Sequence, residues 1–98
     1  MSRTIVFRRQ ARIEYDAAGD WYESRQIGLG AEFTRAVQQV LDQILIQPDS
    51  YAVVWNTVRE ASVPRYPYCV YYKVELDNVL VLAVIHTARD PLIWQSRV

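Results

Sequence analysis

The feature that most constrains the fold is a run of seven consecutive apolar residues at positions 79–85. This run is too short to cross a membrane as a helix, which needs about 20 apolar residues. A strand that is apolar at every position must be covered on both faces, so we expect residues 79–85 to form a central strand. The turn signal Asp77-Asn78 separates the run from the Tyr- and Val-rich residues 68–75, and the two strands are expected to pair antiparallel.

Two helices are predicted upstream of these strands. Residues 31–47 carry apolar side chains at the spacing of one buried helical stripe, and Pro48 ends the helix. The stripe consists of Phe33, Val37, Val40, Leu41, Ile44 and Leu45. Residues 10–26 are predicted to form the other helix. Its expected buried face consists of Ile13, Ala17, Trp21 and Ser24. Trp21 is therefore expected in the core, and Gly28 is expected to end this helix in the left-handed conformation.

The remaining segments complete the expected architecture. Residues 3–9 and 58–63 are predicted to be strands, and residues 49–57 an apolar loop. The order β-α-α-β-β-β predicts an α+β fold, in which an antiparallel helical hairpin packs on a small, mainly antiparallel sheet. Because 98 residues is the size of one domain, we expect a single domain over residues 1–98.

Charge and composition exclude several classes of function. The chain has 11 basic and 11 acidic residues, so bulk attraction to DNA or RNA is not expected. Cys69 is the single cysteine, which rules out an internal disulfide and a cysteine-rich zinc site; we expect it to be a small buried hydrophobic residue. With no targeting segment or membrane span apparent, the default expectation is a cytoplasmic protein without metal or other cofactor.

Several short motifs, taken in order, resemble the RelE/ParE superfamily of toxins from bacterial type II toxin–antitoxin pairs, and look closest to its ParE branch. The motifs are Trp21-Tyr22, Gly28-Leu29-Gly30 with Phe33, Pro48, Arg59, Pro67-Tyr68, Tyr71-Tyr72, and the run from His86 to Pro91 with Trp94. The likeness covers nearly the whole chain. It depends on the order and spacing of the motifs along the β-α-α-β-β-β pattern, and no single motif is specific.

The resemblance implies a toxin that inhibits DNA gyrase by binding it, without catalysis, and that a cognate antitoxin neutralises by wrapping it. The apolar loop has no periodic face of its own, and exposed apolar patches usually mark interfaces. We therefore expect Tyr51, Val54 and Trp55 to contact the antitoxin. Arginine and aromatic side chains are typical anchors of interfaces. The residues expected to contact the target are Arg59, Arg65, His86, Arg89, Trp94 and Arg97.

Two other functions remain open at this point. The first is a RelE-like, ribosome-dependent mRNA endonuclease, since RNA cleavage needs general acid–base groups and cations. Its candidate catalytic residues are Glu60, Arg65, His86 and Arg89. Against it, Lys73 is the only lysine, whereas RelE-like nucleases carry a lysine-rich strand and tend to have a tyrosine where this chain has Trp94. The second is a non-toxic member that only complexes its antitoxin and reaches operator DNA through it.

Several of these residues also have structural interpretations. His86 could cap a strand end, Arg65 could pair with Glu60 or Asp90, and Trp94 could clamp the tail over the sheet. The acidic residues Asp16, Asp20 and Glu23 share one side of the first helix, where we expect a solvated face. Four tyrosines are expected to pack across strands with hydrated hydroxyl groups. They are Tyr66, Tyr68, Tyr71 and Tyr72.

Overall fold

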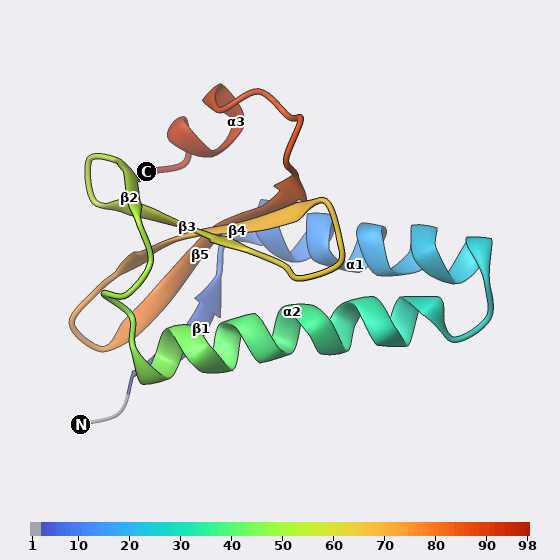
Figure 1. Cartoon of the computed structure of the whole chain (residues 1–98). Coiled ribbons are helices and arrows are strands. Elements are labelled where there is room, and N and C mark those ends of the chain that lie inside the picture. Colours follow the sequence, from blue (N-terminus) through green and yellow to red (C-terminus); the bar gives the residue numbers. More distant parts are fainter. Residues whose placement is uncertain (1–2) are drawn as a thin grey trace.

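The computed structural model describes residues 3–98 as a five-stranded sheet with helices on both faces (Figure 1). The elements are β1 (Thr4–Phe7), α1 (Arg9–Arg25), α2 (Leu29–Ile46), β2 (Val53–Trp55), β3 (Val58–Ser62), β4 (Tyr68–Val74), β5 (Asn78–His86) and α3 (Leu92–Gln95). The sheet order is β1-β5-β4-β3-β2, with β1 parallel to β5 and the other pairs antiparallel. The predicted α+β fold is confirmed. Two short elements, β2 and α3, lie where a loop and a tail were expected.

β5 is an interior strand between β1 and β4, as its apolar run predicts. Residues on one face of β5, such as Val79 and Val84, join the core beneath α1 and α2. Residues on the other face, such as Leu82 and Ile85, join a second cluster beneath α3. The strand can bury both faces only because the tail folds back as α3 over the side that the helical hairpin leaves open (Figure 1).

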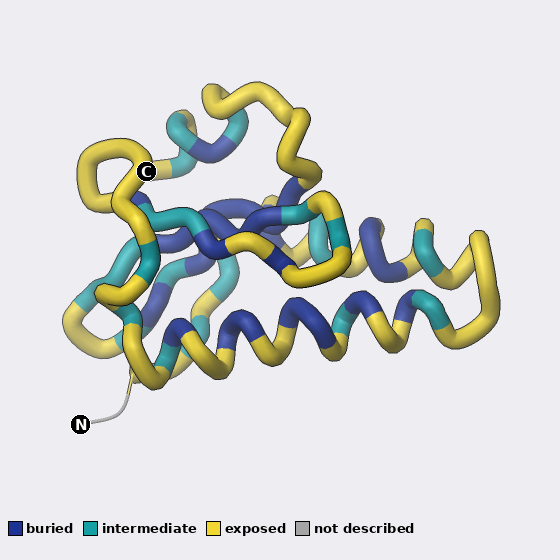
Figure 2. The backbone as a smooth tube through the Cα atoms, viewed as in Figure 1, coloured by how far each residue is buried: buried dark blue, intermediate teal, exposed yellow. Residues whose placement is uncertain are grey.

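The two long helices confirm one predicted buried face and overturn the other. The stripe of α2 from Phe33 to Ile44 is buried against the sheet, which Figure 2 shows along the sheet side of that helix. On α1 the expected face is wrong, because Ile13 is 58% and Trp21 50% exposed. The buried residues of α1 are instead the small ones Ala11, Ala18 and Gly19.

A close approach between the helices explains why α1 buries small residues. A Cβ atom on Gly30 of α2 would lie 2.6 Å from the carbonyl oxygen of Gly19. Cβ atoms in proteins essentially never come so close to a non-bonded heavy atom. Gly28 has φ of 89°, the left-handed conformation expected of it. The expected role is wrong, because α1 already ends at Arg25 with Gln26 as its C-cap, and Gly28 is the N-cap of α2. The carboxylate of Glu23 accepts hydrogen bonds from the amides of Gly28 and Gly30 at 2.9 and 3.0 Å, so Glu23 caps the hairpin rather than facing solvent alone.

The tyrosines of the sheet differ from the expectation in one respect. Tyr71 and Tyr72 pack between strands as expected, but their hydroxyl groups are not left to water. The hydroxyl of Tyr72 donates to the carbonyl of Pro48 at 2.8 Å, and that of Tyr71 donates to Glu60 at 2.7 Å. Cys69 is buried as predicted, and burial raises the pKa of its thiol, so it stays protonated and is a poor nucleophile.

Among residues 3–98, no helix is both long and apolar enough to cross a lipid bilayer. In the same part of the chain, no cluster of three or more His, Cys, Asp or Glu side chains is placed to hold a metal ion. On α1, Asp16 forms a solvent-exposed ion pair with Arg12 at 3.2 Å, one helical turn away.

Candidate functional site

The β3–β4 connection and the segment that follows β5 lie side by side at one end of the sheet. The amide of Thr87 donates to the carbonyl of Pro67 at 2.9 Å, and His86 is the register partner of Tyr68. This pairing gathers three of the predicted site residues, Arg65, His86 and Arg89, at one end of the sheet. We refer to these three residues as the sheet-end surface.

His86 ends β5 and is fixed in orientation. Its Nδ1 atom accepts a hydrogen bond from the amide of Ala88 at 3.0 Å, and its ring meets the ring of Tyr68 edge-on at 5.7 Å. The predicted capping role is confirmed. Because Nδ1 is an acceptor, a neutral imidazole carries its proton on Nε2, and that atom remains available as a hydrogen-bond donor.

Arg65 does not form the ion pair with Glu60 or Asp90 that the sequence suggested. Glu60 accepts from the hydroxyl of Tyr71, and Asp90 Oδ1 accepts from the amide of Leu92 at 2.9 Å. Within residues 3–98, neither Arg65 nor Arg89 has a carboxylate partner. Arg65 has φ of 72°, a left-handed conformation that is rare outside glycine, so the turn holds it against a local cost in energy.

Trp21 is the functional candidate that sequence reasoning assigned to the core. Two adjoining cavities of about 240 and 360 Å³ lie between α1 and the sheet end. Both are lined by Trp21, Tyr68 and His86. Arg89 lines the smaller cavity and Pro67 the larger. We refer to these two cavities together as the Trp21 groove.

The walls of the Trp21 groove are largely aromatic. The guanidinium of Arg25 lies 4.5 Å from the centre of the Trp21 ring, and Tyr22 meets that ring edge-on at 5.0 Å. Tyr22 also packs against Tyr68, and burial raises the pKa of Tyr22, so its hydroxyl stays neutral. The sequence had marked Trp21-Tyr22 and Pro67-Tyr68 as motifs and His86 and Arg89 as candidate contacts, but it did not indicate that Trp21 joins them in one site.

Arg59 lies away from the sheet-end surface. It pairs in register with Tyr72, further along the sheet from the β3–β4 connection. Its guanidinium donates to the carbonyl of Tyr51 at 2.6 Å and lies 3.5 Å from the carboxylate of Asp49. These contacts hold the segment between α2 and β2, so Arg59 has a structural role within the chain.

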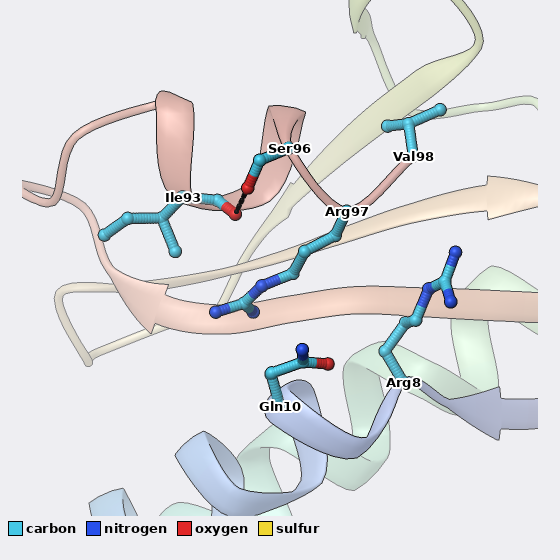
Figure 3. Close-up of a pocket in the computed structure, with 6 residues that line it drawn as sticks. All are labelled: Arg8, Gln10, Ile93, Ser96, Arg97 and Val98. Carbon is cyan, nitrogen blue, oxygen red and sulfur yellow. Dashed lines mark hydrogen bonds between the residues drawn. The ribbon is translucent and has the colours of Figure 1, made fainter.

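Arg97 is also in a structural position. Its guanidinium forms two hydrogen bonds with the carboxylate of Glu14, at 2.9 and 2.8 Å, and one with the carbonyl of Leu82 at 2.9 Å. Figure 3 shows its side chain between α3 and Gln10 in the first turn of α1, beside a cavity of about 490 Å³. The guanidinium of Arg97 is thus engaged within the chain by Glu14 and Leu82.

Trp94 clamps the tail, which was one of its two interpretations. It is 4% exposed, and its ring is stacked on Tyr71 with ring centres 4.7 Å apart. The ring of Trp55 meets the ring of Trp94 edge-on, with ring centres 6.1 Å apart. The burial of Trp94 removes it from the expected target surface.

The expected antitoxin contact is partly exposed. In β2, Val53, Val54 and Trp55 are 50%, 42% and 36% exposed, and β2 is an edge strand of the sheet. Tyr51 is half-buried, with its ring 6.3 Å from that of Tyr72. An uncharged apolar edge strand is unusual in a protein that stays alone in solution. We refer to Val53, Val54 and Trp55 as the β2 strip.

The catalytic set of the nuclease alternative does not come together. Glu60 is paired with Tyr71, whose side chain lies in the cluster under α3. His86 is paired with Tyr68, whose ring packs against the core under α1 and α2. Glu60 and His86 therefore lie on opposite faces of the sheet and cannot act on one phosphate group.

Comparisons with known proteins agree with this fold. A family model described as the ParE toxin of type II toxin–antitoxin systems, parDE, matches residues 5–91. A solved structure described as the chromosomal ParDE toxin–antitoxin system from P. aeruginosa is similar, with a TM-score of 0.72 and 17% sequence identity. The similarity covers 87% of this chain and 96% of that one. No curated protein matches the sequence.

Proposed function

The chain belongs to the ParE toxin family of type II toxin–antitoxin systems, and from this premise we propose that it inhibits DNA gyrase by binding it and is neutralised by a cognate antitoxin. The observation that carries the proposal is the sheet-end surface beside the Trp21 groove. Within residues 3–98, the two arginines and the histidine of this surface have no carboxylate partner, and His86 and Arg89 line a cavity with the half-exposed Trp21. Such a surface suits a protein interface better than a catalytic pocket.

The mechanism follows from the donors of the sheet-end surface. Arg65 and Arg89 can each form bidentate, charge-assisted hydrogen bonds with carboxylates on the target. The orientation of His86 is set by Ala88, so its Nε2 donor is preorganised. Inhibition would come from occupying a surface that gyrase needs in its cycle, and no bond of the target would be broken.

The antitoxin is proposed to contact the β2 strip. Among residues 3–98, no strand pairs with the outer backbone edge of β2, and the side chains of β2 are apolar. A partner segment could add to this edge as a strand and cover Val54 and Trp55. Tyr51 would contribute less, because it is half-buried against Tyr72.

A supercoiling assay with purified gyrase tests the proposed target. We expect the wild-type chain to inhibit supercoiling and Arg89→Ala to reduce inhibition at least about ten-fold. Arg35→Ala, at an exposed position of α2, is the matched control and should inhibit fully. Transcripts cut by the chain on translating ribosomes, with gyrase unaffected, would instead support the nuclease alternative. Inactivity in both assays would support a non-toxic member that only binds its antitoxin.

A further inference from the structure

Two of the polar side chains that line the Trp21 groove, Arg89 and His86, present hydrogen-bond donors to it. Arg89 contributes a guanidinium, and His86 contributes Nε2–H because its Nδ1 accepts from Ala88. Glu14 is the one carboxylate among the residues that line the two cavities, and both of its oxygens are bound by Arg97. A ligand for this groove must therefore bring acceptors, and anionic acceptors fit best.

The walls of the groove favour a ligand that has an apolar group beside those acceptors. Trp21 is half-exposed, and together with Tyr22, Pro67 and Tyr68 it forms an aromatic and aliphatic lining. Arg25 packs on the Trp21 ring, so the indole is held in place before a ligand arrives. A fixed, half-exposed tryptophan beside a cavity is typical of an anchor position in a protein interface.

We propose that the Trp21 groove binds an acidic segment of the antitoxin, with an apolar side chain against Trp21 and a carboxylate at Arg89. The inference rests on the proposed function, in that an antitoxin must prevent the target from reaching the sheet-end surface. The β2 strip lies beside Trp94 and α3, whereas the groove lies between α1 and the sheet. A partner on the β2 strip alone would leave Arg89 and His86 open, so neutralisation requires this second contact.

Charge on the adjoining side of α1 favours an acidic peptide over RNA. Asp16, Asp20 and Glu23 line a neighbouring cavity between α1 and α2. A nucleic acid carries a charge at every phosphate, so its backbone is repelled wherever it runs along this acidic side of α1. A peptide segment can place one or two carboxylates at the arginines and none near Asp20. The zero net charge of the chain also disfavours RNA as the ligand.

The test measures the dissociation constant of the full-length chain for its purified cognate antitoxin by calorimetry. We expect Trp21→Ala and Arg89→Glu each to weaken binding at least about ten-fold, and the loss for Arg89→Glu to shrink at high salt. Arg35→Glu should stay within about two-fold of wild type. Circular dichroism and thermal melting confirm that each variant is folded, which is expected because all three side chains are exposed.

Three outcomes would overturn the inference. The first is an affinity unchanged by Trp21→Ala, and the second is one unchanged by Arg89→Glu. The third is tight binding of a single-stranded RNA decamer that Trp21→Ala abolishes. Gyrase supercoiling is measured in parallel with the free wild-type chain. If the groove variants lose affinity for the antitoxin but the wild-type chain does not inhibit gyrase, the proposed target is wrong. The proposal that the groove binds the antitoxin then still holds. Gyrase inhibition together with unaltered antitoxin affinity would refute the groove alone.

Discussion

The side chains of Glu14 and Arg97, 83 positions apart in the sequence, form a two-hydrogen-bond ion pair that covers the edge of β5 where β1 ends. The last backbone bond on this side is from the amide of Arg8 to the carbonyl of Val81. Beyond it, Arg97 donates to the carbonyl of Leu82, and Glu14 accepts from the amide of Val84. The pair thus replaces a strand and fixes the tail at the same time.

Breaking this pair should destabilise the fold. The two side chains are 14% and 19% exposed, so removing one leaves the other charge poorly hydrated. We expect Glu14→Ala to lower the free energy of unfolding by roughly 3 kcal/mol. The exposed pair of Arg12 and Asp16 is the control, and Arg12→Ala should cost less than about 1 kcal/mol. Urea unfolding measures both, and equal losses for the two variants would contradict the role given to Glu14.

The helical hairpin predicts different responses from two glycines. A Cβ on Gly30 would overlap the backbone oxygen of Gly19, so Gly30→Ala should cost roughly 2 kcal/mol of unfolding free energy. A Cβ on Gly19 would meet only the methyl group of Thr34 at 3.2 Å, and alanine is the better helix former by about 1 kcal/mol. Gly19→Ala should therefore stay within about 1 kcal/mol of wild type. A larger loss for Gly19→Ala than for Gly30→Ala would contradict this packing.

Two tryptophans should behave in opposite ways. Trp94 is buried on Tyr71, so Trp94→Ala should lower the free energy of unfolding by roughly 3–5 kcal/mol. Trp21 is half-exposed, so Trp21→Ala should cost about 1 kcal/mol or less while weakening antitoxin binding. Chemical denaturation and calorimetry together separate the two roles. Equal destabilisation by the two substitutions would show that Trp21 belongs to the core after all.

Which parts of the fold could be predicted from the sequence depends on the kind of contact that forms them. The stripe of α2 and the apolar run of β5 were predictable, because large apolar residues recur at the period of the element. The buried face of α1 was not, because close packing on α2 selects Ala18 and Gly19, which carry little hydrophobic signal. The role of Arg97 depends on Glu14 at the other end of the chain, and no local pattern encodes such a pairing.

Alkaline pH should destabilise the fold through Tyr72. Burial raises the pKa of Tyr72 to about 12, because the ionised phenolate would lie in the core. The native state therefore holds this proton more tightly than the unfolded chain, whose tyrosines titrate near 10. Stability is fully present below pH 10 and falls as pH rises toward 12, by roughly 2 kcal/mol.

Tyr72→Phe provides the control for this pH dependence. The variant loses the hydrogen bond to Pro48, about 1 kcal/mol, and should show a weaker decline above pH 10. Unfolding by urea at a series of pH values measures both effects. A decline of the same size in Tyr72→Phe would assign it to other groups, such as Tyr71, whose pKa burial also raises.

The sheet-end surface is tested most directly by gyrase supercoiling with a triple variant, Arg65→Ala, His86→Ala and Arg89→Ala, compared with wild type and with Arg59→Ala. We predict that wild type and Arg59→Ala inhibit supercoiling, since Arg59 is engaged with Tyr51 and Asp49, and that the triple variant does not. Inhibition by the triple variant at the wild-type level, or no inhibition by wild type at saturating concentration, would contradict the account.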